Sequence, residues 1–257
     1  MIELEHTSHT FAGQPVLRDI SLTVNEGERV VLLGCNGSGK STLLKVLDGL
    51  IWPDTGTLRY DGWPVNKQTL SDPDFAARFR REVVLLFQNP DSMLFHPTVR
   101  EEIAFGPRQL KLDDVDERVA HWAREIGIAS ILDRQPFTLS SGEKQKVCLA
   151  SLLVLEPKLL LLDEPTASLD PRVTGWLIDF LQDLALTTVV TTHNLSLAVE
   201  LGERFILLGE DHMILHDGPS DNLPDDQELL LRANLVHIHR HLHEGVEHRH
   251  FHIHDWD

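Results

Sequence analysis

Short apolar runs recur along the chain and predict its strands. In residues 20–24, Ile20, Leu22 and Val24 alternate with polar residues, which is the pattern of a half-exposed strand near an antiparallel edge. Other runs are apolar or β-branched without interruption, as in strands buried on both faces of a parallel sheet. These runs are Val30–Leu33, Val83–Phe87, Leu159–Leu162 and Val189–Thr192.

The segments between these runs have apolar residues at helical spacing. One helix is predicted from Ser41 to about Leu47, with Gly49 as its stop. Alternating strands and helices predict an α/β fold with a mostly parallel sheet and an antiparallel β edge. The interval from about 89 to 156 is mostly helical and interrupts the strand series, so we expect an inserted helical lobe there. Two more helices are marked by apolar residues three or four positions apart: Val115, Val119, Trp122 and Ile126 before Gly127, and Leu177, Phe180, Leu181 and Leu184 after Pro171.

The composition narrows the functional classes. The net charge of −17 disfavours nucleic acid and anionic lipid as partners, because both attract proteins through Lys and Arg. No apolar run approaches the ~18 residues of a membrane helix, and no signal peptide is expected. Cys35 and Cys148 lack the spacing of a metal site or a disulfide framework, which indicates a reducing cytosol. Any membrane role therefore depends on a partner protein.

Residues 34–41 carry the first chemical signal. They read Gly-Cys-Asn-Gly-Ser-Gly-Lys-Ser and match the phosphate-loop pattern G-x-x-x-x-G-K-[ST], between a predicted strand and a predicted helix. Such a loop turns backbone N–H groups toward phosphate oxygens, and the helix adds the positive end of its dipole. We predict that Lys40 binds the β- and γ-phosphates of ATP and that Ser41 ligates Mg²⁺. The predicted nucleotide-binding residues here are Gly34, Asn36, Gly37, Ser38, Gly39, Lys40, Ser41 and Thr42.

The acidic end of Leu159–Leu162 is the second signal. Asp163 and Glu164 follow four leucines. Alone, such an ending is common, but together with a phosphate loop it becomes specific. Asp163 is predicted to hold Mg²⁺ through water, and Glu164 to accept a proton from the attacking water. The sequence thus predicts hydrolysis of ATP as well as binding.

The segment Leu139-Ser140-Ser141-Gly142-Glu143 opens a helix about twenty residues before Asp163. It resembles the signature of ATP-binding-cassette ATPases, and the resemblance covers nearly all of residues 1–220. It implies a cassette domain over 1–220, built on a phosphate-loop NTPase core, and a C-terminal extension over 221–257. The signature residues Ser140, Ser141, Gly142 and Glu143 would contact the γ-phosphate bound to a second cassette.

The resemblance also assigns single residues. Phe11 would stack on adenine, and Gln88 would ligate Mg²⁺ and sense the transporter partner. His193 would contact the γ-phosphate and orient Glu164, and the loop Ala167–Asp170 would communicate across the dimer. Taken singly, His193 is more often a structural histidine and Phe11 a plain core residue. The implied assembly is a head-to-tail dimer, most simply of two identical chains, bound to integral membrane subunits at the cytoplasmic face without entering the membrane.

Several segments resemble the energy-coupling-factor importers, and within them the cobalt and nickel uptake ATPases. They are Phe87–Asp91, Leu94–Phe95, Pro97–Val99 and Ala104–Pro107. Met93 and His96 depart from the residues expected there. Ser141 and Glu143 replace a glycine and a glutamine of the signature. We expect these two to tune the turnover rate, with Lys144 offsetting the added negative charge.

The C-terminal extension is rich in histidine. In an extended chain, alternate residues share a face, so each of two alternating sets is predicted to present four imidazoles to Ni²⁺, Co²⁺ or Zn²⁺. The alternatives are a solvated tail or an expression tag, and the interleaved Ile, Leu, Arg, Glu and Phe argue against a plain tag. The two sets are His237, His239, His241 and His243, and His248, His250, His252 and His254.

The leading hypothesis is an ATPase subunit that binds ATP and Mg²⁺ and energises import of nickel or cobalt through a membrane partner. A second hypothesis keeps the ATPase but gives it another cargo, such as a vitamin. A third is a soluble cassette of translation or DNA repair, although such proteins usually carry two cassettes, long coiled coils or basic arms. The fourth is a metal store with secondary ATPase activity.

Overall fold

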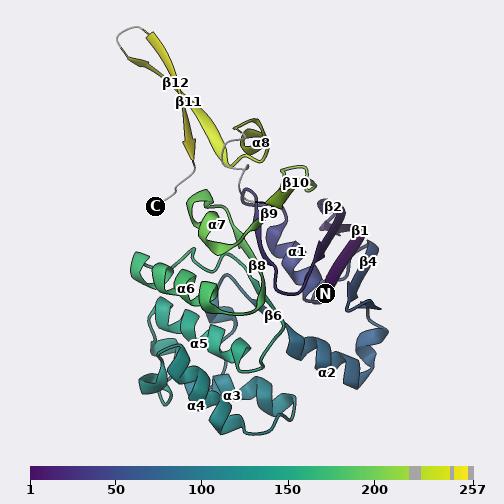
Figure 1. The fold of residues 1–257 in the computed structure, drawn as a ribbon, viewed down its shortest axis with the longest axis vertical. Coiled ribbons are helices and arrows are strands. Elements are labelled where there is room, and N and C mark those ends of the chain that lie inside the picture. The colour runs from purple at the N-terminus through teal and green to yellow at the C-terminus, as the bar shows by residue number, and fades with distance from the viewer. Residues whose placement is uncertain (220–226, 244–245, 254–257) are drawn as a thin grey trace. The chain divides into compact units, whose positions relative to one another are not determined.

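The computed structural model describes residues 1–219, 227–243 and 246–253, the last two strands by their backbone alone. The chain forms two compact units, residues 1–64 with 189–257 and residues 65–188. Figure 1 traces the chain from its purple N-terminus to its yellow C-terminus. Within the described ranges, no helix has the length and apolar character needed to cross a membrane.

An antiparallel sheet opens the first unit, in the strand order β2-β1-β4-β5. The residues Ile20, Leu22 and Val24 are buried, and their exposed neighbours alternate with them along β2. Because β2 is the edge strand and pairs antiparallel with β1, the predicted half-exposed antiparallel edge is confirmed. The strands are β1 (Ile2–Phe11), β2 (Gln14–Val24), β4 (Thr55–Tyr60) and β5 (Trp63–Pro64).

A second group of strands in the first unit follows the order β10-β9-β3-β8. β3 and β9 are parallel and buried along almost their whole length, which explains their uninterrupted apolar sequences. The elements are β3 (Arg29–Leu33), α1 (Lys40–Leu47), β8 (Thr187–Thr192, beginning in the second unit), α7 (Leu195–Leu201), β9 (Arg204–Leu208), β10 (Ile214–Pro219) and α8 (Gln227–Arg232). A hairpin of β11 (Val236–His243) and β12 (Val246–Ile253) follows α8.

The second unit holds a parallel pair of fully buried strands, β6 (Val83–Leu86) and β7 (Leu159–Leu162). Between them the chain is helical. The helices of this unit are α2 (Pro73–Glu82), α3 (Val99–Gln109), α4 (Val115–Glu125), α5 (Ser141–Leu153) and α6 (Pro171–Asp183). Short 3₁₀ turns are η1 (Thr69–Ser71), η2 (Pro90–Ser92), η3 (Ala129–Ile131) and η4 (Pro136–Thr138).

The predicted helices are confirmed almost to the residue. α1 begins at Lys40, one residue before the predicted start, and the Gly49 N–H closes its end by donating to the Val46 carbonyl at 3.0 Å. The periodic residues Val119 and Leu177 are buried in α4 and α6. The predicted α/β class, with parallel core strands beside an antiparallel sheet, is also confirmed.

Candidate functional site

The loop between β3 and α1 owes its shape to three glycines. Gly34, Gly37 and Gly39 have φ of 159°, 85° and 110°, a region that residues with a Cβ rarely adopt. At Gly39 a Cβ would also collide with the carbonyl oxygen of Val16 in β2, and at Gly34 it would lie 2.6 Å from the Ser38 Oγ. Glycine therefore favours this curled backbone at all three positions, and at Gly34 and Gly39 the close contacts also leave no room for a Cβ.

The same loop offers the groups that a phosphate needs. Within the described chain, no side chain caps the start of α1, whose N-cap residue is Gly39. The Lys40 ammonium is buried and donates to the carbonyls of Gly34 at 2.7 Å and Cys35 at 3.1 Å. The buried Ser38 hydroxyl has no hydrogen-bond partner in the described part of the chain. A buried polar atom without a partner is costly, so the loop fits an incoming anion.

A residue that the sequence analysis did not single out supports this loop. The His212 Nδ1 donates to the Ser38 carbonyl at 3.1 Å, and the Arg18 N–H donates to the His212 carbonyl at 2.9 Å. His212 lies in the turn between β9 and β10 and adopts a left-handed conformation with φ of 65°. It lies 174 positions from Ser38 along the chain, and no local pattern links the two.

Two further predicted residues belong to the first unit. Phe11 ends β1 and has 70% of its surface exposed, which corrects the alternative of a plain core residue. His193 is part-buried and follows β8, the neighbour of β3 in the strand order. The next residue, Asn194, caps α7 by accepting from the Leu197 N–H at 3.1 Å.

The predicted acids lie in the second unit, directly after β7. Asp163 and Glu164 are both buried, with 4% and 6% of their surface exposed. The Asp163 N–H donates to the Leu86 carbonyl at 2.9 Å and so extends the β6–β7 ladder past the last leucine. Glu164 has φ of 44°, a left-handed conformation that is uncommon and costly for a residue with a side chain. Such a backbone often accompanies a functional role.

The buried Gln145 of α5 ties the signature helix to the loop after these acids. Its Nε2 donates to the Pro165 carbonyl at 3.0 Å. Close to it, a Cβ at Gly142 would lie 2.9 Å from a methyl group of Val173 in α6. Gly142 therefore permits close approach of α5 and α6, and Gln145 holds the peptide next to Glu164.

The signature itself forms a capped helix start. Ser140 is the N-cap of α5, and its N–H and hydroxyl donate to the Glu143 carboxylate at 2.8 and 2.9 Å. The Glu143 N–H donates back to the Ser140 Oγ at 3.3 Å, which completes a capping box. These bonds, with a smaller contribution from Arg134, hold the pKa of the Glu143 carboxyl below its ordinary value.

The expected role of Lys144 is wrong. Its ammonium pairs with Asp91 at 2.6 Å, whereas Glu143 pairs with Arg134 at 3.3 Å. Arg134 can contact Glu143 because it lies in the turn that precedes α5, between η3 and η4. The charge of Glu143 is therefore offset by a cation that comes before the signature, and Lys144 instead ties α5 to η2.

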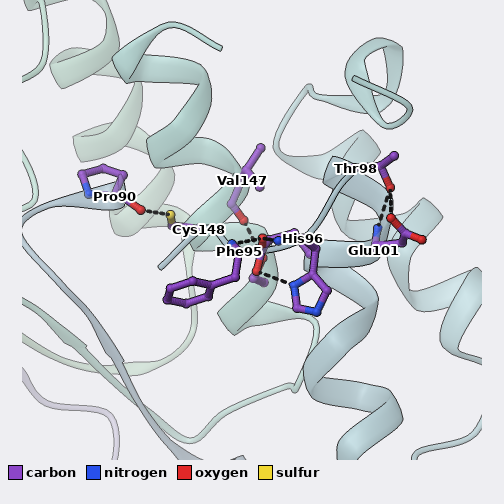
Figure 2. A network of polar contacts seen from close by, with 9 residues as sticks. Pro90, Phe95, His96, Thr98, Glu101, Val147 and Cys148 are labelled. Atoms are coloured by element: carbon purple, nitrogen blue, oxygen red, sulfur yellow. Dashed lines mark hydrogen bonds and ion pairs between the residues drawn. The ribbon is translucent and has the colours of Figure 1, made fainter. Parts of the chain in front are cut away.

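The segment from Gln88 to Glu102 follows β6. Gln88 is exposed two residues after the strand. Both departures from the family pattern have partners here: the Met93 sulfur accepts from the Phe87 N–H at 3.4 Å, and His96 contacts the buried Glu102. The Glu102 carboxylate accepts from the backbone N–H groups of Phe95 at 2.7 Å and His96 at 2.8 Å, and lies 3.1 Å from the His96 Nδ1. Figure 2 shows this network.

Phe95, His96 and Phe105 form an aromatic surface in and next to this segment. Phe95 has 77% of its surface exposed, and Phe105 has 47%. The His96 ring lies between the two in sequence and 4.7 Å from the Phe105 ring centre. On the inner side of this segment, Cys148 donates to the Pro90 carbonyl at 3.7 Å (Figure 2), and burial raises the pKa of its thiol to about 12. Cys148 is therefore a packing residue.

The C-terminal histidines lie on a hairpin. In its register, His237, His239 and His241 of β11 stand opposite His252, His250 and His248 of β12, while His243 stands opposite Val246. His254 lies outside the described residues. Three members of each predicted set thus stand opposite one another across the hairpin. Metal binding by them stays a prediction.

The profile of the ABC transporter family matches residues 17–167, from β2 to the loop that follows Glu164. The chain belongs to the ABC transporter ATP-binding family. This confirms the resemblance drawn from the phosphate loop and the signature, and it makes the chain an ATPase.

Two relatives of this ABC ATPase carry specific names. The energy-coupling factor transporter ATP-binding protein EcfA of Methanothermobacter thermautotrophicus is 39% identical over 91% of this chain and 76% of its own length. The nickel import ATP-binding protein NikO of Rhodobacter capsulatus is 39% identical over 91% of this chain and 95% of its own.

Two solved structures of ABC ATPases are also similar to this chain. CbiO1 of Clostridium perfringens, described as part of the ABC transporter complex CbiONQ, has a TM-score of 0.76 at 29% identity and covers 91% of this chain and 94% of its own. The ATP-binding cassette MJ0796, dimeric with ADP and phosphate bound in a post-hydrolysis state, has a TM-score of 0.76 at 25% identity, over 86% of this chain and 99% of its own.

The chemistry of the three predicted Mg²⁺ ligands suits the ion that accompanies ATP. Ser41, Gln88 and Asp163 offer a hydroxyl, an amide oxygen and a carboxylate, and Mg²⁺ prefers oxygen ligands. The three residues come from the start of α1, the segment after β6 and the end of β7. Their roles as ligands remain predictions.

Proposed function

We propose that this ABC ATPase is the ATP-hydrolysing subunit of an energy-coupling-factor type importer and powers uptake of a transition-metal ion, nickel or cobalt. The observation that carries the proposal is the likeness to NikO over nearly the whole of both chains. CbiO1, part of CbiONQ, supports the same branch from the structural side. The chain would work at the cytoplasmic face of the membrane, bound to integral membrane subunits.

In this proposal the phosphate loop binds the triphosphate. The Lys40 ammonium exchanges its loop carbonyls for β- and γ-phosphate oxygens, and the Ser38 hydroxyl gains a partner. Phe11 stacks on the adenine through its exposed ring. Ser41, Gln88 and Asp163 hold Mg²⁺, which neutralises phosphate charge when bound.

Hydrolysis in this proposal relies on Glu164. Its carboxylate accepts a proton from the water that attacks the γ-phosphate, and His193 contacts the γ-phosphate and orients Glu164. The left-handed backbone of Glu164 and the Gln145 bond to the next peptide support this role, because both restrain the position of the carboxylate. The signature, Ser140 to Glu143, acts on the nucleotide of a second cassette, so two copies form a head-to-tail dimer. The dimeric MJ0796 structure supports this assembly.

The membrane partner would contact the aromatic surface of Phe95, His96 and Phe105. Two exposed aromatic rings are suited to a protein interface, where aromatic residues are enriched: Phe95 lies on the loop held by the buried Glu102, and Phe105 lies on α3. Gln88 precedes this loop by seven residues, so the same segment would link the partner to the nucleotide site.

Glu164→Gln tests the enzymatic part of the proposal. The amide cannot accept the proton, so phosphate release should fall by about 10²–10⁴-fold while Mg·ATP affinity changes little. With ATP bound and not hydrolysed, the variant should accumulate as a dimer on size exclusion with light scattering. Glu203→Gln makes the same chemical change at an exposed carboxylate paired with Arg29 and should retain turnover. Turnover of Glu164→Gln within a few-fold of wild type would remove Glu164 from its role.

The cargo is tested by reconstitution into vesicles with candidate membrane subunits. Uptake of Ni²⁺ or Co²⁺ that requires ATP and stops in the Glu164→Gln complex is the expected result. Uptake of a vitamin and of neither metal would replace the cargo while leaving the ATPase assignment intact.

A further inference from the structure

The C-terminal hairpin places histidines opposite histidines. Three directly opposed pairs follow one another along the ladder: His237 with His252, His239 with His250, and His241 with His248. Residues two positions apart on a strand share a face, so all six occupy the same face of the hairpin. This arrangement results from pairing and cannot be read from either strand alone.

The spacing of such a ladder suits metal binding. Directly opposed residues of an antiparallel pair have Cβ atoms about 4.5–5.5 Å apart, and successive pairs follow at about 6.6–6.8 Å. A Cβ separation of this size allows the two residues of one pair to serve as ligands of one cation. We propose that these three cross-strand histidine pairs form a transition-metal site on the hairpin, with each opposed pair as its binding unit.

The chemical class of the ligand follows from the donors. Neutral imidazole binds nickel, copper, zinc and cobalt, whereas Mg²⁺ and Ca²⁺ prefer oxygen. No Asp or Glu occupies the histidine row, since Glu247 stands opposite Leu242 in the other row. The net charge of −17 also attracts cations to the molecule.

The residues that alternate with the histidines form a second row on the opposite face of the hairpin, and this row explains why the register matters. It pairs Val236 with Ile253 and Ile238 with Phe251, apolar residues next to each other at the end that follows α8. A slip of one position would set each histidine opposite a residue of this row and would turn the whole pattern over. An isolated two-stranded hairpin is marginally stable, so a cation shared across the strands would stabilise the pairing that creates its own site.

This site is separate from the nucleotide site and from the proposed transport. Among the residues whose side chains the structure describes, no group of three or more His, Cys, Asp or Glu could hold a metal. The hairpin would bind a transition metal even if the importer carried a vitamin, so its test is independent of the cargo.

Two double variants of the full chain remove the same number of histidines and separate pairing from mere histidine content. His241→Ala/His248→Ala removes one opposed pair and leaves two. His237→Ala/His248→Ala breaks two pairs and leaves one. Ni²⁺ capacity is measured by calorimetry and metal analysis, without nucleotide and after chelator treatment. A chain shortened before Val236 subtracts metal bound elsewhere. ATP hydrolysis, which involves none of these residues, confirms that each variant is folded.

We expect the first variant to keep about two thirds of the wild-type capacity and the second about one third, in proportion to the opposed pairs that remain. His243→Ala, which removes a histidine opposite Val246, should keep all of it. Equal losses of Ni²⁺ capacity in the two double variants would overturn the proposal, because the capacity of an unpaired tail depends only on the number of its histidines. The reverse order would also overturn it, since the first variant keeps two opposed pairs and the second keeps only one. Wild-type capacity no greater than that of the shortened chain would overturn it outright.

Discussion

The helix starts of α1 and α5 both belong to the predicted ATP site, and they are built in opposite ways. At α1 the N-cap is a left-handed glycine, Gly39, and within the described chain no side chain caps the first turn. At α5 the N-cap is Ser140, and the chain closes the first turn upon itself through Glu143. The first start leaves ligand recognition to backbone and Lys40, whereas the second is already stabilised before any nucleotide arrives.

The difference assigns a distinct physical role to each start. A helix N-terminus attracts anions through its N–H groups and dipole, and a carboxylate in the first turn uses part of that attraction. At α5, Glu143 is such a carboxylate, and Arg134 compensates its charge at 3.3 Å. We infer that α1 provides most of the phosphate affinity and that α5 provides a rigid surface for a nucleotide held by the other cassette.

The largest expected effect is a loss of Mg·ATP binding, at the glycines that precede α1. Gly39→Ala places a Cβ against the Val16 carbonyl oxygen in a left-handed conformation, so the loop must move away from β2. Measurable Mg·ATP binding should be lost. Gly37→Ala is the matched control: φ is 85°, but a Cβ there meets nothing within 4 Å. It costs only the conformational penalty, about 1–2 kcal/mol, or roughly tenfold in affinity.

Calorimetric titration with a slowly hydrolysed ATP analogue measures both affinities, and thermal unfolding shows whether each variant is folded. Similar affinities for Gly37→Ala and Gly39→Ala would contradict the structural role of the Val16 contact. They would place the contribution of the loop in backbone flexibility alone.

A smaller effect, on the free energy of unfolding, is expected at the start of α5. Glu143→Ala and Ser140→Ala each break the capping box, which should cost about 1 kcal/mol and lower the melting temperature by about 2–4 °C. Their double variant should cost less than the sum, because both single changes remove the same reciprocal bonds. Ser141→Ala changes an exposed neighbour outside the box and should stay within about 0.5 kcal/mol of wild type. Additive losses at Ser140 and Glu143 would mean that the box is not formed.

Local chemistry was predictable at both starts, and long-range contacts were not. The phosphate loop could be recognised because its pattern is continuous in sequence, and Lys40 donates to the nearby carbonyls of Gly34 and Cys35. The buried strands could be recognised because β6 and β7 are apolar throughout. Ser140 and Glu143 also match the capping-box pattern at sequence level, and this local pattern indicates the cap that is observed at α5.

Contacts between distant segments explain what the sequence could not show. Lys144 is adjacent to Glu143 in sequence but pairs with Asp91, 53 positions away, because a helix directs neighbouring residues to different faces. His212 reaches Ser38 only through the fold. In the same way, the histidine alternation is visible along each C-terminal strand, but which histidine stands opposite which depends on the hairpin register.

The smallest effect, and the most specific for the second start, concerns the charge of Glu143. Hydrogen bonds from Ser140 lower the pKa of this carboxyl from its ordinary value of 4.5, so its charged form stabilises the folded state above pH 4.5. That stabilisation is lost as the pH falls through the lower, folded-state pKa. Glu143→Gln keeps an acceptor for the box but does not titrate. At pH 7 its melting temperature should lie about 1–2 °C below wild type, which reflects a carboxylate at a helix N-terminus. This difference should shrink as the pH falls below 4.5. A difference that stays constant down to pH 3 would show that the charge of Glu143 contributes nothing to the start of α5, and that an uncharged box is sufficient there.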